Sequence, residues 1–124
     1  MIATEGIPHQ SEADFKVIEL QAEICRTLAN PKRLQIVNLL KNGELSVGEI
    51  VRAMGIPKSN ASQHLSVTRQ KGLIVSRRVG TTIFYRLASP KITEACSLMR
   101  EVLLSLLVDR ETLSRKIRGA SKMP

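Results

Sequence analysis

The sequence predicts a mainly α-helical domain that carries one small β-hairpin. Three observations lead to this fold class. Apolar residues recur at helical spacing through most of the 124 residues, residues 73–87 are rich in strand-forming side chains, and proline and glycine separate the helical segments. A chain of this length is expected to form one domain. We place that domain at 13–118, between a flexible N-terminal segment at 1–12 and a flexible basic tail at 119–124.

The first helix is expected to start near Asp14 and to stop at Asn30-Pro31, because the residue before a proline disfavours helical backbone. Glu19 and Glu23 fall on one side of it. Its apolar residues fall roughly on the other side and are Phe15, Val17, Ile18, Ile24, Cys25 and Leu28. A domain this short buries a modest share of its surface, so an apolar terminal helix could gain stability by pairing with a second copy.

Two further short helices follow. Pro31 can open the second helix at its first position, and Gly43 is expected to end it in the left-handed conformation. Ser46 with Glu49 three residues later is a capping box, which predicts a third helix of about nine residues that Gly55 closes.

The fourth helix, predicted from Lys58 or Ser59 to Gly72, contains no acidic residue. Its inward positions are expected to be Ala61, His64 or Leu65, and Thr68, which leaves the hydroxyl and amide side chains outside. Two short helices separated by "GIP", with the second rich in Ser, Asn and Gln, form a helix-turn-helix pattern.

Residues 73–87 predict a two-stranded hairpin that turns around Val79-Gly80-Thr81, because they are rich in β-branched and aromatic side chains. One face could hold Leu73, Val75, Ile83, Tyr85 and Leu87. The alternate positions hold Arg78, Thr82 and Arg86.

Ser89-Pro90 is expected to cap a long final helix. Apolar residues recur along it at threes and fours over about seven turns. They are Ile92, Ala95, Cys96, Met99, Val102, Leu103, Leu106, Leu107, Leu113 and Ile117. We interpret this stripe as a dimer seam, with burial inside the monomer as the alternative, because a short domain often needs a partner to complete its core.

The net charge of +8 is concentrated in the middle of the chain. No acidic residue lies between Glu49 and Glu94, whereas the basic and acidic residues of the rest of the chain balance. The eight cations of this interval are Arg52, Lys58, Arg69, Lys71, Arg77, Arg78, Arg86 and Lys91. An ordinary solvated face is one reading, but so many unbalanced charges favour a polyanionic partner. Nucleic acid is preferred to a membrane, since the segment lacks a large apolar face.

Other classes of protein find little support in the sequence. Two cysteines 71 positions apart do not form the disulfide framework of a small secreted domain. The N-terminus lacks the basic start and apolar run of a signal peptide, and no stretch approaches a membrane span, so we expect a cytoplasmic protein. Nucleophile elbows, phosphate-cradling glycine loops and paired carboxylates are missing from the basic region, so we expect neither an enzyme nor a cofactor.

The order of helix, short helix, amide-rich helix and basic hairpin is that of a winged helix-turn-helix, here α-α-α-α-β-β-α. An α-helix fits the major groove of B-DNA, where Asn and Gln suit adenine, and Ser and backbone amides suit phosphates. A basic hairpin tip reaches the neighbouring minor groove or backbone. This order of elements therefore predicts that the middle segment binds double-stranded DNA.

The segments "LANPKRLQIVNLL" and "GELSVGEIVRAMGIPKSNASQHLSVTRQKGLIVSRRVGTTIFYRL" resemble the ArsR/SmtB family of winged-helix repressors. The combination of "SxxSQHL", "KGLI" and "IFYRL" carries the resemblance. It covers residues 28–87 closely and 15–107 in layout. It implies a homodimer built on the first and last helices, whose operator DNA is released when an inducer binds.

Carried onto this chain, the resemblance implies DNA contacts by the fourth helix and the wing. The residues concerned are Lys58, Ser59, Asn60, Ser62 and Gln63 on the helix, and Arg77, Arg78 and Thr81 on the wing. We also expect Arg69, a cation of the same helix, to contact DNA. His64 is similar to the family's usual histidine, and we favour packing or hydrogen bonding over a ligand role for it. The family usually has leucine in place of Thr68, so the Thr68 hydroxyl should bond a helix carbonyl or a polar neighbour.

The sequence does not identify the inducer. Metal-sensing members use a Cys-x-Cys cluster or a set of histidines on the last helix, and neither is present here, so we expect no metal site. For Cys25 and Cys96, plain core packing and a thiol sensor of oxidants, reactive sulfur species or arsenicals are both open. Family members that sense sulfur species or oxidants usually have their early cysteine in the second helix, where this chain has Asn38 or its neighbours. The alternative functions are a winged helix used for protein–protein contact and a metal-responsive repressor.

Overall fold

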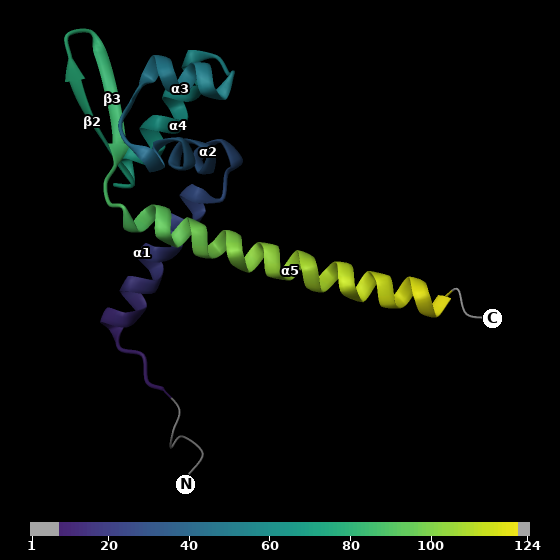
Figure 1. Cartoon of the computed structure of the whole chain (residues 1–124). Helices are drawn as coiled ribbons and strands as arrows, with labels where there is room; N and C mark the ends of the chain where they lie inside the picture. Colours follow the sequence, from purple (N-terminus) through teal and green to yellow (C-terminus); the bar gives the residue numbers. More distant parts are fainter. Residues whose placement is uncertain (1–7, 122–124) are drawn as a thin grey trace. The chain divides into compact units, whose positions relative to one another are not determined.

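Residues 8–121, the part of the chain that the computed structural model describes, form helices and one small antiparallel sheet (Figure 1). In chain order the elements are α1 (Glu12–Leu28), α2 (Pro31–Leu39), the 3-10 helix η1 (Leu40–Asn42), β1 (Leu45–Ser46), α3 (Val47–Met54), α4 (Lys58–Gln70), β2 (Ile74–Val79), β3 (Thr82–Leu87) and α5 (Lys91–Ser121). The chain divides into two compact units after Ala88, the first ending with β3 and the second holding α5. The predicted fold class, mainly helical with a small β element, is confirmed.

Side-chain caps fix where α1 and α2 begin. Ser11 Oγ accepts a hydrogen bond from the backbone N–H of Asp14 at 3.2 Å, and the Asp14 carboxylate accepts one from the backbone N–H of Ser11 at 3.1 Å. This capping box starts α1 at Glu12, two residues earlier than predicted. Asn30 Oδ1 accepts from the backbone amides two and three residues further on, at 2.9 and 3.2 Å, and Pro31 opens α2 as predicted.

The capping box predicted for α3 is confirmed. Ser46 Oγ accepts from the Glu49 backbone N–H at 3.1 Å, and the Glu49 carboxylate accepts from the Ser46 backbone N–H at 3.0 Å. Gly55 ends α3 in the left-handed conformation with a φ of 64°, also as predicted. Gly43 differs: its φ is 140° with a ψ of −175°, so it leads the chain into β1 rather than forming a left-handed helical cap.

β2 and β3 form the predicted hairpin, called the wing below, in which Val79 pairs with Thr82 across the loop of Gly80 and Thr81. The sheet also has a third strand that was not predicted. β1 pairs with β3, which gives the strand order β1-β3-β2. A strand of two residues is too short to show alternation in a sequence. Because Ser46 ends β1 and also caps α3, this pairing ties the start of α3 to the wing.

The register of the wing corrects the predicted strand faces. Directly opposed pairs include Ile74–Leu87, Ser76–Tyr85 and Arg78–Ile83. Opposed residues share a face, so Arg78 lies on the Tyr85 side, and its predicted place beside Thr82 is wrong. Arg77 takes that place. Ile74, only 1% exposed, is the β2 residue of the core, whereas Val75 is half-buried on the other face. The pairing register decides which of the two alternating rows of side chains faces the core, and the composition of the strands did not reveal this register.

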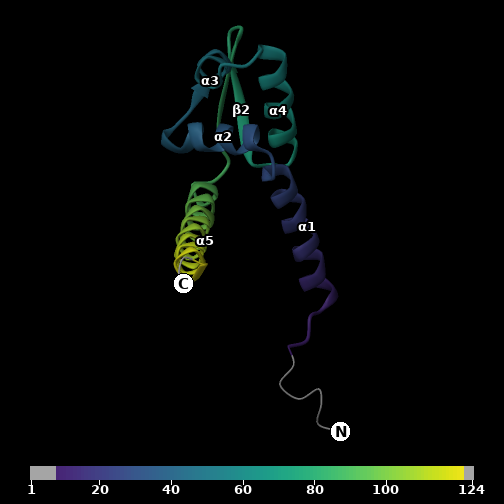
Figure 2. The same ribbon diagram turned by 90° about the vertical axis from the view of Figure 1, so that its right-hand side faces the viewer.

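Helices α2, α3 and α4 gather beside the wing in both views (Figures 1 and 2). The core between them consists of Ile36, Leu40, Ile50, Met54, Leu65, Ile74 and Tyr85. The predicted inward row of α4 is confirmed, since Ala61, Leu65 and Thr68 have no exposed surface. The Thr68 hydroxyl donates to the His64 carbonyl at 2.7 Å, which is the helix-carbonyl bond that the sequence predicted.

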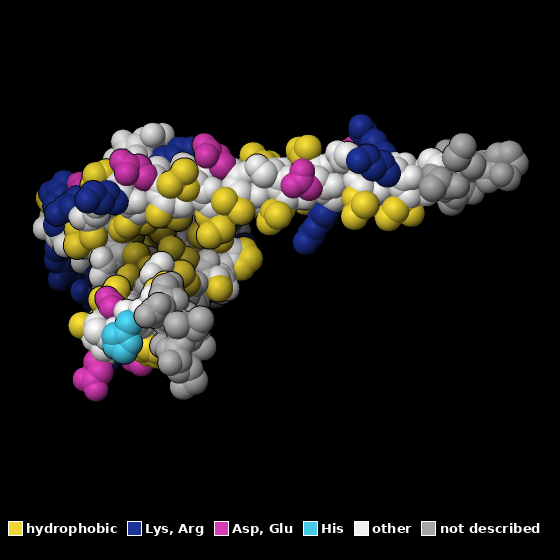
Figure 3. Space-filling view, turned by 90° about the horizontal axis from the view of Figure 1, so that it is seen from below, with side chains coloured by type: hydrophobic (Ala, Val, Ile, Leu, Met, Phe, Trp, Pro, Cys, Tyr) yellow, Lys and Arg dark blue, Asp and Glu magenta, His cyan; other side chains and the backbone are white. Residues whose placement is uncertain are grey.

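α5 is a single helix of 31 residues. Ser89 Oγ accepts from the Lys91 backbone N–H at 3.2 Å, so the predicted cap is present. The helix continues to Ser121, so residues 119–121 of the predicted flexible tail are helical. Residues 122–124 lie outside the described residues, as do 1–7 of the predicted N-terminal segment. From Leu98 onward, the large apolar side chains of α5 are exposed by 47–68% (Figure 3). Between residues 8 and 121 no helix has the length and apolarity to span a membrane.

We predict that Ser46→Ala destabilises the protein by about 1 kcal/mol, because the first-turn amide of Glu49 loses its acceptor. The measurement is the free energy of unfolding in urea at fixed protein concentration. Ser76→Ala, at an exposed strand position, is the control and should change stability little. Equal losses in the two variants would contradict a capping role for Ser46.

Candidate nucleic-acid interface

The buried row of α4 determines which of its side chains face solvent. With Ala61, Leu65 and Thr68 inward, the polar residues of the first turns are left exposed. They are Lys58, Ser59, Asn60, Ser62 and Gln63, and we call them the outer face of α4. Arg69 is exposed two turns further along. The structure thus brings every predicted α4 contact residue to the surface of one helix.

On the wing, Arg77, Arg78 and Thr81 are all exposed, but the Arg77 side chain already interacts with other side chains of the domain. Its Nε lies 2.8 Å from Glu44 Oε2 and its Nη2 lies 2.6 Å from Glu44 Oε1, while its guanidinium lies 4.9 Å from the centre of the Phe84 ring. These hydrogen bonds hold the pKa of Glu44 below its ordinary value. Arg77 is therefore held against the body of the domain, and its charge is balanced.

The expectation of eight unbalanced cations in the middle of the chain is wrong for two of them. Arg77 pairs with Glu44, and Lys71 Nζ lies 3.8 Å from Glu23 Oε2. Both carboxylates belong to segments before the acid-free interval, so only folding brings them close. Within residues 8–121, Lys58, Arg69 and Arg78 form no ion pair. A basic surface made of α4 and the wing therefore persists in the folded chain.

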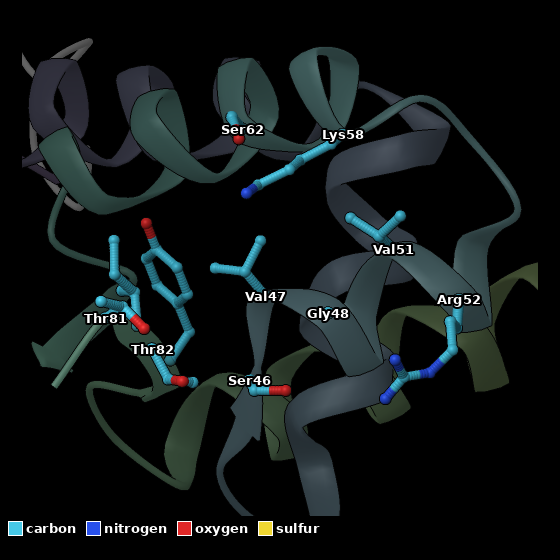
Figure 4. A pocket seen from close by; sticks show the side chains of 11 residues that line it. Ser46, Val47, Gly48, Val51, Arg52, Lys58, Ser62, Thr81 and Thr82 are labelled. Carbon is cyan, nitrogen blue, oxygen red and sulfur yellow. The ribbon is translucent and has the colours of Figure 1, made fainter. Parts of the chain in front are cut away.

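A hollow of about 430 Å³ lies between α3, the first turns of α4 and the wing (Figure 4). We call it the α3–wing hollow. It is lined by Ser46, Val47, Gly48, Val51, Arg52, Lys58, Ser62, Thr81, Thr82, Ile83 and Tyr85. Lys58 extends from α4 toward its middle, Thr81 and Thr82 form one wall, and Arg52 lies at the other end. Lys58, Ser62 and Thr81 were predicted as contact residues.

Arg52 was not among the predicted contacts, although it is one of the eight basic residues of the middle segment. The signal that could have found it is its place in α3, the helix that precedes the recognition helix of a helix-turn-helix. Arg52 comes to line the hollow because β1 pairs with β3, and the sequence did not reveal that pairing.

The two cysteines are free thiols in different units of the chain. Cys25 on α1 is exposed, so packing inside its own unit does not describe it, and Cys96 on α5 is half-buried. His9 is exposed and His64 half-buried. No group of three or more His, Cys, Asp or Glu that could hold a metal ion occurs in the part of the chain that the structure describes.

Known proteins match both the sequence and the fold. The profile described as "Bacterial regulatory protein, arsR family" matches residues 30–76. The HTH-type transcriptional regulator Rv0081 of Mycobacterium tuberculosis is 39% identical over 111 residues, which cover 89% of this chain and 95% of that protein. Its crystal structure aligns with a TM-score of 0.70 over 76% of this chain and 95% of its own.

Two further proteins are similar to this chain in sequence or in structure. The biofilm growth-associated repressor of Xylella fastidiosa is 38% identical over 89 residues, or 71% of this chain and 78% of the relative. The solution structure of a homodimeric winged helix-turn-helix DNA-binding domain from Mycobacterium bovis has a TM-score of 0.71 and 33% identity, over 82% of this chain and 94% of its own. The predicted fold and the resemblance are both confirmed: the protein has a winged helix-turn-helix fold and belongs to the arsR family of bacterial regulatory proteins.

Proposed function

We propose that this chain is a transcriptional regulator that binds operator DNA as a homodimer in the cytoplasm, and that it acts by binding rather than by catalysis. The observation that carries the proposal is the exposed outer face of α4, free of acidic residues and placed beside a basic wing. Membership of a family of regulatory proteins supports it, and the name of the Xylella relative favours repression over activation.

The chemistry of the outer face fits a major groove. Gln63 and Asn60 each offer a donor and an acceptor, which suits the adenine edge, and hydroxyls such as those of Ser59 and Ser62 can reach bases or phosphates. Lys58 and Arg69 supply unpaired charge for the backbone, and Arg78 and Thr81 extend the contact along the wing. We assign Arg77 mainly to holding the wing through Glu44, because the Arg77 guanidinium already donates two hydrogen bonds to that carboxylate.

The pattern of α5 supports the homodimer. Eight of its positions follow one another in alternating steps of four and three, the spacing of a coiled-coil seam. They hold Ile92, Cys96, Met99, Leu103, Leu106, Arg110, Leu113 and Ile117. Arg110 alone interrupts an apolar row, and the large apolar residues of the row from Met99 onward are at least half exposed. An apolar row this long on one helix calls for a partner helix.

α1 also presents an unpartnered apolar surface. Five of its large apolar side chains are exposed by 39–62%, and they are Phe15, Val17, Ile18, Leu20 and Ile24. The charged side chains of Lys16, Glu19 and Glu23 gather on the remaining side. We propose that α1 joins α5 in the dimer interface. The homodimeric state of the similar Mycobacterium bovis domain supports the pairing of two copies.

A thiol sensor is the second role that the structure favours, because Cys25 is exposed on α1 and Cys96 lies on the proposed α5 seam. Both cysteines then belong to helices that set the distance between the DNA-binding surfaces of the two protomers in the proposed dimer. Oxidation or persulfidation there would alter the interface, and through it the fit to DNA.

We predict that Ser62→Ala with Gln63→Ala lowers the affinity for an operator selected in vitro by about 100-fold, since each good base contact contributes about 1–3 kcal/mol. Gel-shift titration measures the affinity, and sedimentation verifies that the dimer is intact. Asn38→Ala with Asn42→Ala, at exposed sites on α2 and η1, is the matched control. Undiminished operator binding by the first variant would remove the recognition role of α4.

The same titrations distinguish DNA binding from use of the wing as a protein-docking surface. Binding of a duplex through this basic face should weaken steeply as salt rises, because counterions are released on binding. If no duplex is bound with such a dependence, the proposed function is wrong.

For the dimer, we predict that Leu103→Glu with Leu106→Glu converts the protein to a monomer, because charge is placed in the apolar seam. Sedimentation equilibrium should then give 13.7 kDa instead of twice that mass. Leu104→Glu is the control: Leu104 is equally exposed but lies off the seam. Dissociation by the control variant, or none by the double variant, would show that the seam is misassigned.

For the thiols, we predict that treatment with an oxidant or a persulfide donor weakens operator binding of the wild type, and that Cys25→Ser with Cys96→Ser abolishes the response. Intact mass measured in parallel identifies the modification. A wild-type response in the double variant would exclude both cysteines as the sensor.

A further inference from the structure

We propose that the α3–wing hollow seats a phosphate of the DNA backbone, held by Arg52 of α3 together with Lys58 of α4. This inference rests on the proposed function, because the phosphate belongs to the bound duplex. It adds a contact from α3 to those of α4 and the wing, and it gives Arg52 a role that the sequence did not reveal.

The lining of the hollow matches a phosphate diester. Cations come from two different helices, Arg52 on α3 and Lys58 on α4. Hydroxyls come from three directions, with Ser46 at the end of β1, Ser62 on α4 and Thr82 on β3. No carboxylate is among the lining residues. Such a surface offers donors and positive charge to an anion from several sides at once.

Arg52 is positioned for this role, and among residues 8–121 its side chain forms no hydrogen bond. Its Nη1 lies 3.6 Å from the point where a side chain on Gly48 would begin, so the guanidinium folds back over the first turn of α3. Glu49 is the acidic group near it, and Arg52 helps to lower the pKa of that carboxyl. The Glu49 carboxylate, however, is bonded to the backbone of Ser46, and Arg52 forms no ion pair among residues 8–121.

The position of the hollow agrees with the geometry of a bound duplex. Lys58 and Ser62 belong both to the hollow and to the outer face of α4, so the two surfaces are continuous. If α4 lies in the major groove, α3 crosses the DNA backbone at the edge of that groove, which brings phosphates beside the hollow. Arg52 can then present two N–H groups to the non-bridging oxygens of one phosphate, while Lys58 adds a point charge.

The first test is the salt dependence of binding by the full-length chain to a duplex selected in vitro. Arg52→Gln should reduce the slope of log affinity against log salt by about one for each protomer, and should weaken binding about tenfold or more at moderate salt. Lys41→Gln removes the same charge from an exposed site on η1 and should leave the slope unchanged. Arg52→Lys should recover most of the slope but not the full affinity, because lysine lacks the fork.

The second test locates the phosphate. Single methylphosphonate substitutions neutralise one backbone phosphate at a time, and one position should weaken binding of the wild type but have no further effect on Arg52→Gln. If Arg52→Gln behaves like Lys41→Gln while the wild type still binds DNA with a steep salt dependence, the phosphate seat is wrong and the proposed function stands. NMR shifts in the hollow with inorganic phosphate alone, combined with an unchanged DNA slope, would assign the hollow to a free anion and overturn the proposal.

Discussion

The orientation of α4 about its own axis is the constraint on which the interface depends. Three inward side chains, Ala61, Leu65 and Thr68, have no exposed surface, and they hold the helix against the core between α2 and the wing. A rotation by one residue would bury polar side chains, Asn60 and His64 in one direction or Ser62 and Arg69 in the other, and would expose Leu65, at a cost of several kcal/mol for the polar groups alone. The polar outer face is therefore a consequence of packing on the opposite side of the same helix.

Thr68 shows how a polar residue can take part in that packing. Its hydroxyl is satisfied within α4 by the His64 carbonyl, so burial leaves no unpaired donor. The methyl group can then pack like part of a small apolar side chain. A short β-branched residue replaces the leucine expected there from the family resemblance, and the same side of α4 still packs against the core.

Local signals predicted much of this fold, and contacts between distant segments account for what they missed. Capping boxes, prolines and glycines act within a few residues, so the starts of α2 and α3 and the turn of the wing could be read from the sequence. β1 exists only because β3 lies beside it. The Arg77–Glu44 pair joins positions 33 residues apart, and its formation depends on the same sheet. The candidate contacts on α4 and the wing were predicted from the sequence, whereas the place of Arg52 in the α3–wing hollow, where three elements meet, was not.

Ser46 belongs to two elements at once, as the last residue of β1 and the cap of α3. There is no linker between them to absorb a hinge motion, and the Arg77–Glu44 pair adds a clamp between the wing and the segment leading into β1. The helix-turn-helix and wing should consequently move as a rigid block. Any signal that controls this protein would then work by changing the distance and angle between two such blocks, leaving the shape of each one unaltered.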